Sequence, residues 1–386
     1  MRIAIACYPT FGGSGVVASE LALAMADRGD EVHVLSYALP PRIAAEGPEH
    51  GVVFHEVKVP PYPLFEYPPY SLALASKMVE VSRSRHLDLL HVHYAVPNAV
   101  SAILARQILG ERSLPVVTTL HGTDITLVGN DPSYLETTRF GVLESDAVTA
   151  VSHSLRERTL QQLAIEREIE VIPNFVDAQR TLRPAVVERP LAPHGERLLV
   201  HVSNFRPVKR LPDVVEVFRR VREQVPCRLV LVGDGPERAA TAGRIEAAGL
   251  SSVTTSLGTL DRVEPVLWQS DLLLLPSEEE SFGLVALEAL ACEVPVIATR
   301  VGGLPEVVPD GEVGLLYEVG DTAGMAAGAL RLLRDEPARR RMAEAGRRWA
   351  TTRFDREEIV ERYRALYRTT LARAGREREL VVRSRK

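Results

Sequence analysis

The chain has 386 residues, which is more than one compact core usually holds, so two domains of roughly 150 to 200 residues are expected. Apolar residues make up 46% and charged residues 25%, as in globular proteins, which excludes a disordered, collagenous or coiled-coil chain. The 46 Lys and Arg residues against 51 Asp and Glu residues give a formal net charge of -5, which leaves no broad cationic face for nucleic acid.

The cysteines and the N-terminus bear on the compartment. Cys7, Cys227 and Cys292 are too few and too scattered for a disulfide framework, and none has metal or redox spacing. We interpret each as a small core residue in a reducing compartment. The apolar start at residues 3–8 is short and followed by glycines, which predicts a strand rather than a signal peptide. No apolar run reaches the roughly 18 residues of a membrane span, so we expect a cytoplasmic protein.

The first half of the chain predicts a parallel sheet. Residues 3–8 are apolar throughout, a glycine-rich turn follows, and apolar side chains then recur at helical spacing before Gly29 ends the helix. Further apolar runs alternate with helical stretches, which is typical of a parallel sheet covered on both faces. These runs are residues 32–37, 89–92, 116–120, 147–151 and 171–172.

The second half repeats this pattern after a connection. The Pro-rich residues 173–195 have little periodicity, so they suit a link between domains. Two helical stretches follow, at 213–222 and 284–291, among six strand-like runs. These runs are residues 197–203, 228–233, 253–258, 271–277, 294–300 and 313–319. The predicted fold class is therefore α/β, with two doubly wound, Rossmann-like domains facing across a cleft.

The C-terminal sequence, from about 338 to 378, predicts a charged helix. Its apolar contributors are Trp349, Phe354, Ile359, Tyr363 and Leu366. The helix is expected either to cap the second domain or to cross back to the first. We place the domains at residues 1–172 and 173–356, with the last helix at about 357–386. The basic end of the chain is interpreted either as a solvated helix end or as a contact for a membrane surface or a polyanion.

Candidate site residues should follow strands, because open parallel sheets bind ligands beyond the carboxyl ends of their strands. Residues 12–15 (Gly-Gly-Ser-Gly) follow the first strand. Backbone amides there, including that of Gly13, have room to approach an anion at the start of a helix. A plain tight turn is the alternative. The loop lacks the GxGxxG spacing of a dinucleotide fingerprint.

Further polar candidates of the first half end later strands or lie in the next helical stretch. They are Tyr94, Thr118, His121, Asp124 and Arg139. His121 is interpreted either as a contact for a substrate oxygen or as a structural histidine. The chain has no Cys/His metal spacing and no Asp-x-Asp pair, so we expect cationic side chains and helix amides, not a divalent metal, to meet a bound diphosphate.

A basic loop opens the second half. Asn204, Arg206 and Lys209 follow the strand-like run 197–203, and cations at the carboxyl edge of a sheet suit a diphosphate. Solvated loop charges are the alternative. Gly233, in the sequence Val-Gly-Asp-Gly-Pro, follows the next strand, and a purely geometric role is equally open for it.

Two carboxylates flank the start of a later helix. Glu280 lies in the loop after residues 271–277, and Glu288 lies in the helical stretch that follows. A carboxylate only accepts hydrogen bonds, so a pair of them suits the vicinal hydroxyls of a sugar. Favourable pairing with the helix dipole is the alternative reading.

Together, the two doubly wound halves, the glycine loop, the basic loop and the Glu-x7-Glu segment with VPVIATRVGGLPEVV resemble the retaining family 4 glycosyltransferases of the GT-B fold. The resemblance covers nearly the whole chain. Four segments of the first half resemble the branch of that family that joins N-acetylglucosamine to L-malate at the start of bacillithiol biosynthesis. They are YPLFEYPPYSLALASKMVEV, HVHYAVPNAVSA, TTLHGTDITLVGNDPSY and RFGVLESDAVTAVS.

The resemblance implies a role for each candidate. Glu288 would hold the uridine ribose, Glu280 the hydroxyls of the sugar, and Lys209 the diphosphate. The donor-binding residues so implied are Gly13, Asn204, Arg206, Lys209, Gly233, Glu280, Phe282, Gly283 and Glu288. The acceptor-binding residues are Ser14, Tyr94, Thr118 and Arg139, and the catalytic residues are His121, Lys209 and Glu280. Many relatives have Gly-Arg where this chain has Ser203-Asn204, so Arg206 is the candidate for the missing phosphate contact.

The implied reaction moves N-acetylglucosamine from UDP-N-acetylglucosamine to the 2-hydroxyl of L-malate with retention at the anomeric carbon. The leaving diphosphate oxygen would accept the malate proton on the same face of the sugar, without a metal or other cofactor. The partners would be these two small molecules, with no nucleic acid and no membrane span, and a homo-oligomer stays open. The alternatives are another acceptor, such as inositol phosphate or a sugar, a UDP-N-acetylglucosamine epimerase, and a non-catalytic nucleotide-sugar sensor.

Overall fold

The computed structural model describes residues 1–10, 12–61, 63, 66–110, 114–128, 131–187 and 190–384, with side chains up to residue 375 apart from 127 and 128. The chain forms two compact units. The first holds residues 1–173 and 357–386, and the second holds residues 174–356. The chain thus passes from one unit to the other twice, at 173/174 and at 356/357; the sequence placed the first crossing at 172/173.

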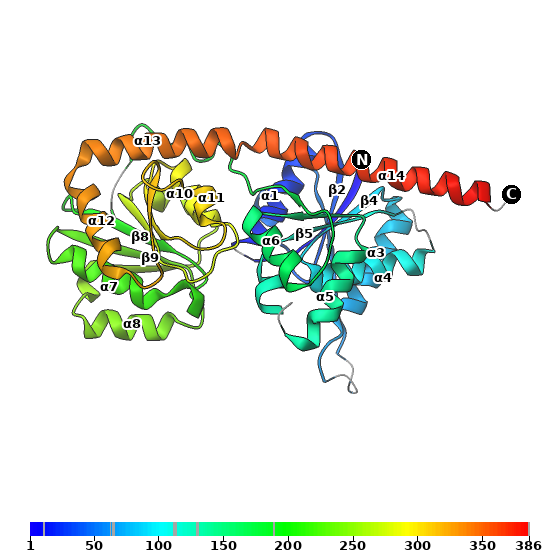
Figure 1. The fold of residues 1–386 in the computed structure, drawn as a ribbon, viewed down its shortest axis with the longest axis horizontal. Helices are drawn as coiled ribbons and strands as arrows, with labels where there is room; N and C mark the ends of the chain where they lie inside the picture. The colour runs from blue at the N-terminus through cyan, green and yellow to red at the C-terminus, as the bar shows by residue number, and fades with distance from the viewer. Residues whose placement is uncertain are drawn as a thin grey trace. The chain divides into compact units, whose positions relative to one another are not determined.

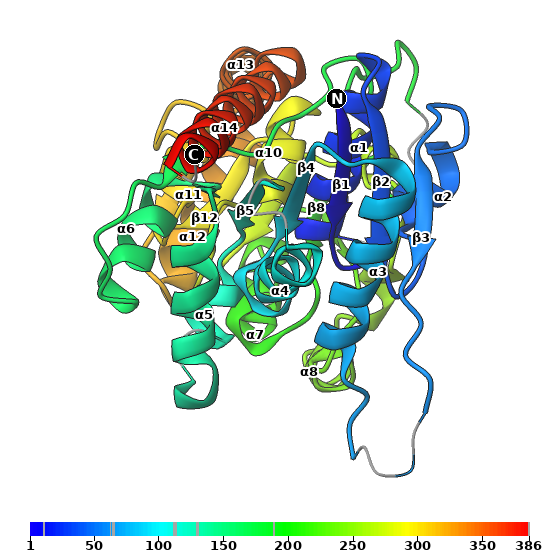
Figure 2. The same cartoon turned by 90° about the vertical axis from the view of Figure 1, so that its right-hand side faces the viewer.

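The first unit is built on a seven-stranded parallel sheet with the order β3-β2-β1-β4-β5-β6-β7 (Figure 1). The strands are β1 (Arg2–Ala6), β2 (Glu31–Ser36), β3 (Val53–Glu56), β4 (Leu89–His93), β5 (Val116–Leu120), β6 (Ala147–Ala150) and β7 (Glu170–Val171). Figure 2 shows β1 between β2 and β4, which is where the strand order reverses. Ligands of such sheets bind at this switch point, beyond the carboxyl ends of the strands.

The helices of the first unit cover this sheet. They are α1 (Ser14–Asp27), α2 (Pro41–Glu46), α3 (Tyr70–Arg85), η1 (Ala95–Ala99), α4 (Val100–Leu109), η2 (Asp124–Val128), α5 (Pro132–Glu144), α6 (His153–Gln162) and α14 (Arg356–Ser384). The apolar positions predicted for the first helix, such as Leu21 and Met25, are fully buried in α1. α1 is the first helix after β1, so Gly13 and Ser14 lie in the connection that leaves the carboxyl end of β1.

The second unit has a six-stranded parallel sheet with the order β10-β9-β8-β11-β12-β13. The strands are β8 (Arg197–Val202), β9 (Cys227–Val232), β10 (Thr254–Gly258), β11 (Leu272–Leu275), β12 (Val296–Thr299) and β13 (Gly314–Tyr317). Its order reverses between β8 and β11, so the second switch point lies there. The prediction of two doubly wound α/β units is confirmed.

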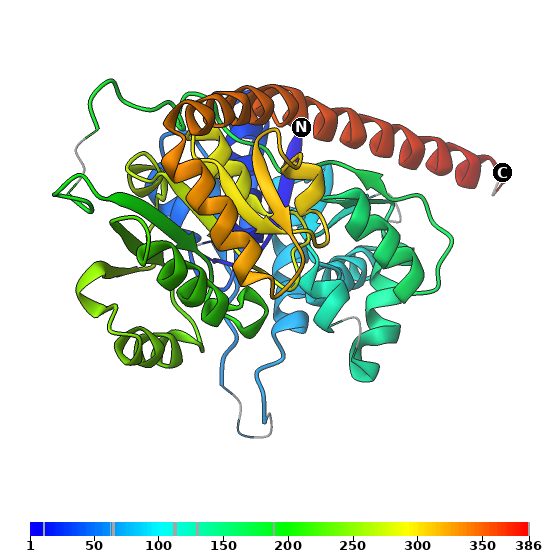
Figure 3. The same cartoon turned by 60° about the vertical axis from the view of Figure 1, so that its left-hand side comes forward.

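The helices of the second unit are η3 (Pro207–Lys209), α7 (Leu211–Arg222), α8 (Arg238–Ala247), η4 (Ser251–Val253), α9 (Glu264–Leu267), α10 (Leu284–Ala291), α11 (Leu304–Val307), α12 (Thr322–Arg334) and α13 (Glu336–Arg353). α12 packs against α7 and against the strands β12 and β13 (Figure 3). The core between them contains Phe218 and Met325, both fully buried, so an aromatic and an aliphatic side chain fill the space between helices and sheet.

The predicted C-terminal helical stretch is interrupted in the structure, and its last helix begins at Arg356, next to the predicted start at about 357. α13 ends at Arg353, and Phe354 leaves helical geometry with φ −123° and ψ 37°. Its ring is buried against Phe282 and Trp349, with ring centroids 5.7 and 6.2 Å away. α14 then starts at Arg356. Burial of Phe354 explains the break, since a continuous helix would have to give up that packing.

α14 returns to the first unit and docks there through buried tyrosines. The sequence named Tyr363 and Leu366 as contacts, whereas Tyr363 and Tyr367 are the fully buried side chains and Leu366 is only partly buried. The hydroxyl of Tyr367 lies 2.6 Å from Nδ1 of His91 in β4, and Nε2 of His91 lies 2.7 Å from Oγ1 of Thr119 in β5. A buried chain of polar groups therefore joins α14 to the sheet.

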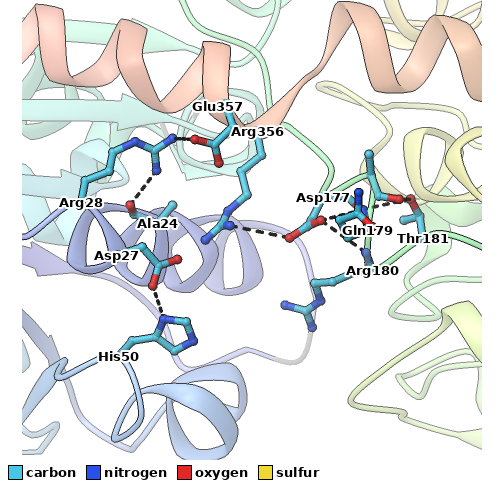
Figure 4. A network of polar contacts seen from close by, with 11 residues as sticks. Ala24, Asp27, Arg28, His50, Asp177, Gln179, Arg180, Thr181, Arg356 and Glu357 are labelled. Carbon is cyan, nitrogen blue, oxygen red and sulfur yellow. Dashed lines mark hydrogen bonds and ion pairs between the residues drawn. The ribbon is translucent and has the colours of Figure 1, made fainter.

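Polar contacts also surround the second crossing (Figure 4). In the second unit, Arg356 lies 3.6 Å from a carboxylate oxygen of Asp177, whose other oxygen accepts from the backbone N–H groups of Gln179 and Arg180. In the first unit, Glu357 pairs with Arg28, the residue after α1. Each end of the crossing is thus fixed to its own unit.

The cysteines are the next feature of the fold. Cys7, Cys227 and Cys292 are free and buried, as the sequence predicted. Burial raises the pKa of Cys7 and of Cys227 to about 12 and also raises the pKa of Cys292.

Within the described part of the chain, none of the helices has both the length and the apolar character needed to cross a bilayer. The basic side chains from residue 376 onward lie outside the described side chains.

Candidate functional site

Ser14 and Tyr94 meet across the switch point of the first unit. Ser14 opens α1 after β1, and Tyr94 follows β4 directly. The Ser14 hydroxyl donates a hydrogen bond to the Tyr94 hydroxyl over 3.1 Å. Tyr94 has φ 82°, a left-handed conformation that a non-glycine residue seldom adopts and that is often found at functional positions. The structure therefore brings two predicted acceptor-binding residues together.

An aromatic group surrounds the Tyr94 side chain. The ring of Tyr8, which follows β1, lies 5.3 Å from the Tyr94 ring, and the ring of His121 lies 5.4 Å from the Tyr94 ring. Tyr8 was not predicted as a site residue, although it follows a strand, as Tyr94 does. Gly13, the residue before α1, is exposed with φ 59°.

His121 is paired with a second imidazole. Its Nε2 lies 2.7 Å from Nδ1 of His93, and the two rings stack with centroids 5.0 Å apart. His93 is fully buried, whereas His121 keeps part of its surface exposed. Desolvation lowers the pKa of His121 to about 3 and places the pKa of His93 well below its ordinary value. Both imidazoles are therefore neutral near pH 7, and each offers one donor and one acceptor.

The buried carboxylate of Asp124 anchors the loop that carries His121. It accepts hydrogen bonds from the backbone N–H groups of Gly122 (2.9 Å), His121 (3.3 Å) and Ala95 (3.2 Å). Burial raises the pKa of Asp124 to about 6, although these backbone donors oppose the shift. The position of the His121 backbone is thus fixed by a side chain at the start of η2.

Thr118 and Arg139 form no hydrogen bond with this group among the described residues. Thr118, in β5, is fully buried, and its hydroxyl lies 2.7 Å from the hydroxyl of Ser145. Its side chain is therefore already satisfied inside the unit. Arg139 lies in α5 and is partly exposed, and it forms no ion pair with the residues that the structure describes. A partly buried guanidinium of this kind suits an anionic ligand.

The second unit has a charged pair at its own switch point. The ammonium of Lys209, at the end of η3, lies 2.5 Å from Oε1 of Glu280, which follows β11. The Ser277 hydroxyl donates to the same oxygen over 3.0 Å. The backbone N–H of Glu278 donates to the carbonyl of Val208 over 2.8 Å, so the two loops are also joined through their backbones. Lys209 and Glu280, predicted for adjacent parts of one ligand, are in contact.

Two glycines allow neighbouring loops to pack closely against these two loops. Gly302 has φ 51°, and a Cβ there would lie 1.9 Å from the carbonyl oxygen of Glu280. Gly233 has φ 124°, and a Cβ there would lie 1.8 Å from the carbonyl oxygen of Ser203. Any other residue would displace the backbone beside Glu280 or beside Asn204. The structure therefore gives Gly233 a geometric role, which the sequence left open.

The remaining donor-side candidates lie around this pair. Asn204 is exposed, and Arg206 is partly exposed and has no ion pair among the described residues. Phe282 is buried, and Gly283, with φ 93°, precedes α10. Glu288 lies within α10 and is partly exposed. No three His, Cys, Asp or Glu side chains in the described part of the chain are grouped so as to hold a metal ion.

His93 and Ser277, like Tyr8, are site neighbours that the sequence did not predict. Each ends a strand or follows one, so the strand-end rule could have selected them. Their partners could not be read from the sequence. His93 meets His121 because β4 and β5 pair with His93 opposite Thr119, and that register follows from the packed sheet.

Comparisons with known proteins agree with this architecture. The family described as "Glycosyltransferase Family 4" matches residues 11–180, and "Glycosyl transferases group 1" matches residues 183–349. The chain is 47% identical over 95% of its length to N-acetyl-alpha-D-glucosaminyl L-malate synthase of Bacillus anthracis, 96% of which is covered. It is 29% identical to a D-inositol 3-phosphate glycosyltransferase of Pseudarthrobacter chlorophenolicus, with 85% of this chain and 83% of that protein covered.

Solved structures share the fold. The Anabaena protein HepE in complex with UDP and glucose matches with a TM-score of 0.83 at 20% identity, covering 96% of this chain and all of that chain. A glycosyltransferase of Rickettsia africae matches with a TM-score of 0.79 at 19% identity, covering 96% of this chain and 98% of that one.

Proposed function

The chain belongs to the family 4 glycosyltransferases, and we propose that it transfers N-acetylglucosamine from UDP-N-acetylglucosamine to the 2-hydroxyl of L-malate, as in the first step of bacillithiol biosynthesis. One observation carries the substrates: the 47% identity, over 95% of the chain, to a protein named for that product. The inositol phosphate glycosyltransferases are more distant, for example at 29% identity. L-Malate is therefore the favoured acceptor.

The second unit is proposed to bind the donor. Lys209 would neutralise the diphosphate, and Arg206, which has no ion pair among the described residues, would add a second cation. A diphosphate bound at Lys209 would replace Glu280 as the ion-pair partner of the ammonium. The Glu280 carboxylate would then accept hydrogen bonds from hydroxyls of the sugar, and Glu288 would do the same for the ribose. Asn204, Gly233 and the amides of Phe282 and Gly283 would complete the donor site.

The first unit is proposed to bind the acceptor. Ser14 and Tyr94 would supply hydroxyl groups, and the Arg139 guanidinium would form a forked contact with a malate carboxylate. Thr118 would act through the shape of the site, because its hydroxyl is engaged by Ser145. Gly13 would offer its backbone amide to the diphosphate at the start of α1. His121 would lie beside the donor sugar.

The proposed mechanism is a same-face substitution without a covalent enzyme intermediate. The malate hydroxyl attacks the anomeric carbon, the bond to the diphosphate breaks, and the leaving oxygen takes the hydroxyl proton. A double displacement would need a carboxylate nucleophile, and Glu280 is engaged by Lys209 and Ser277. Catalysis then depends on positioning, which contributes up to about 7 to 11 kcal/mol in well-aligned systems, and on stabilising the leaving charge at Lys209.

One incubation tests the proposal. The pure protein is mixed with UDP-N-acetylglucosamine and L-malate without added metal, and the product is identified by mass and by anomeric configuration. The expected product is the α-glycoside of malate, with one UDP released for each product formed. Inositol phosphate offered alone should give little UDP, and its efficient use would replace the acceptor. Conversion of the donor with no acceptor present would indicate an epimerase instead.

A further inference from the structure

The pair formed by His93 and His121 has a definite proton arrangement. Both imidazoles are neutral near pH 7, so each carries one N–H group, and the 2.7 Å contact between His93 Nδ1 and His121 Nε2 contains one proton. Two arrangements are possible. Either His93 donates from Nδ1, or His121 donates from Nε2. The choice decides which nitrogen of His121 carries its proton.

The surroundings of the other ring nitrogen of His93, Nε2, distinguish the two arrangements. His93 Nε2 is buried and has no hydrogen-bond partner among the described residues. If His121 donated, His93 would carry its own proton on Nε2, and a buried N–H would be left unpaired. If His93 donates, only a lone pair is left unpaired. Buried N–H groups without a partner are rarer in proteins than under-used acceptors, so donation by His93 is favoured.

The consequence falls on His121. When Nε2 accepts the bond from His93, the single proton of the neutral His121 ring must be on Nδ1. His121 is the only one of the three imidazoles in this group that keeps exposed surface, since His91 and His93 are fully buried. No described residue accepts a hydrogen bond from His121 Nδ1. That N–H is therefore the polar group that the ring offers to a ligand.

We propose that His93 is a positioning residue that holds His121 as the Nδ1–H tautomer, so that His121 presents a neutral hydrogen-bond donor to an oxygen of the glycosyl donor. The ligand rests on the proposed function, whereas the tautomer is a property of the protein alone. Phosphoryl and sugar oxygens both accept such a bond. Asp124 fixes the backbone of His121, and His93 fixes its ring and its proton.

The tautomer is measured directly by NMR of protein carrying ¹⁵N-labelled histidine. Long-range couplings between ring nitrogens and ring carbon-bound protons distinguish Nδ1–H from Nε2–H. The His121 signals are assigned by their loss in His121→Gln. We expect His121 and His93 both to be Nδ1–H tautomers in the wild-type protein at pH 7.5. An Nε2–H signal from His121, or a mixture of tautomers, would overturn the proposal.

Variants of His93 connect the tautomer to turnover. His93→Leu removes the donor and should lower kcat by about 10- to 100-fold with the KM for malate nearly unchanged, as for other outer-shell partners. His93→Asn places an amide N–H near the position of Nδ1 and should recover most of the lost kcat and the Nδ1–H signal. A fall in kcat without a change in the His121 tautomer would contradict the proposal.

His91→Gln is the matched control. His91 lies in the same strand and is equally buried, but its ring nitrogens bond to Thr119 and Tyr367 rather than to His121. This variant should keep the Nδ1–H tautomer of His121 and the wild-type kcat. If the wild-type protein does not form the malate glycoside, the proposed function fails while the NMR measurement still decides the tautomer. If His93→Leu does not fold, the wild-type and His93→Asn spectra decide it.

Discussion

The ammonium of Lys209 lies 2.5 Å from Oε1 of Glu280, across the point where the strand order of the second unit reverses. The two groups assigned to the diphosphate and to the sugar are thus each other's partners. Phosphate oxygens would compete with Glu280 for the same ammonium. The binding free energy gained when the diphosphate pairs with Lys209 is therefore offset by the loss of the ion pair with Glu280. Lys209 should thus contribute mainly by stabilising the charge that develops on the leaving group.

Replacing Lys209 by Met should lower kcat by roughly 10²- to 10³-fold, as for the loss of one preorganised charge-stabilising group. The reason is that the leaving diphosphate loses its cation, while Glu280 keeps the hydrogen bond from Ser277. UDP release at saturating substrates measures the effect. Lys77→Met is the control, because it removes a lysine whose ion pair in α3 has an exposed partner, Glu80. A Lys209→Met enzyme with unchanged kcat would contradict the assigned role.

Replacing Arg139 by Ala should raise the KM for malate by about 10- to 100-fold, the range expected for a charge-assisted hydrogen bond worth about 1.5 to 3 kcal/mol. The affinity for the donor should change little, because Arg139 belongs to the first unit. Initial rates with each substrate varied in turn measure both quantities. Arg156→Ala, which removes a partly exposed guanidinium from α6, serves as control. A collapse of donor affinity with malate affinity intact would refute this division of labour.

A metal chelator should leave the transfer rate within about twofold of the untreated rate, because cationic side chains take the role of a metal clamp in the proposed site. Lys209 and Arg206 are those side chains. The measurement compares UDP release with and without an excess of chelator, followed by addition of magnesium. A rate that falls on chelation and returns with magnesium would show that this part of the proposal is wrong.

Replacing Tyr367 by Phe should lower the free energy of unfolding of the first unit by about 1 to 3 kcal/mol, because a buried nitrogen of His91 loses its partner. Urea denaturation followed by circular dichroism measures the change. Tyr134→Phe, at an exposed position of α5, should stay within about 0.5 kcal/mol of the wild type. Equal losses in the two variants would mean that the buried hydrogen bond has no specific effect.

His91 should make the first unit sensitive to acid. Burial lowers the pKa of His91 to about 3 from an ordinary value of 6.5. Between these values the unfolded chain binds a proton at this site and the native chain does not, so stability falls as the pH falls, by about 1.4 kcal/mol per pH unit. In His91→Gln the slope of the unfolding free energy against pH, between pH 5 and 6, should decrease by about 1.4 kcal/mol per pH unit, which corresponds to one proton. Above pH 7.5, where His91 is neutral in both states, the two slopes should agree.

Much of the fold follows from the sequence, because buried parallel strands are continuous apolar runs with loops at their ends. The strand of residues 53–56 was missed, since β3 lies at the sheet edge and its side chains are only partly buried. The break at Phe354 was missed as well, because the packing that causes it involves Phe282, distant in the sequence.

The sequence predicted many residues of the candidate site but not the contacts between them. Ser14, Tyr94, Lys209 and Glu280 were selected because they follow strands, and strand ends are local features. The contacts among them are not local, since Lys209 and Glu280 are separated by 71 positions. The imidazole pair was missed for the same reason: the register between β4 and β5 brings His93 to His121, and nothing near either residue encodes it.

The three buried cysteines provide a way to observe opening of each unit. A thiol reacts with alkylating reagents as the thiolate, and a pKa of about 12 leaves Cys7 and Cys227 almost entirely protonated at pH 7. Neither sulfur is accessible in the native fold. Labelling must therefore wait for local or global opening, with Cys7 reporting on the first unit and Cys227 and Cys292 on the second. The rates of thiol labelling at these cysteines therefore report separately on the opening of the two units.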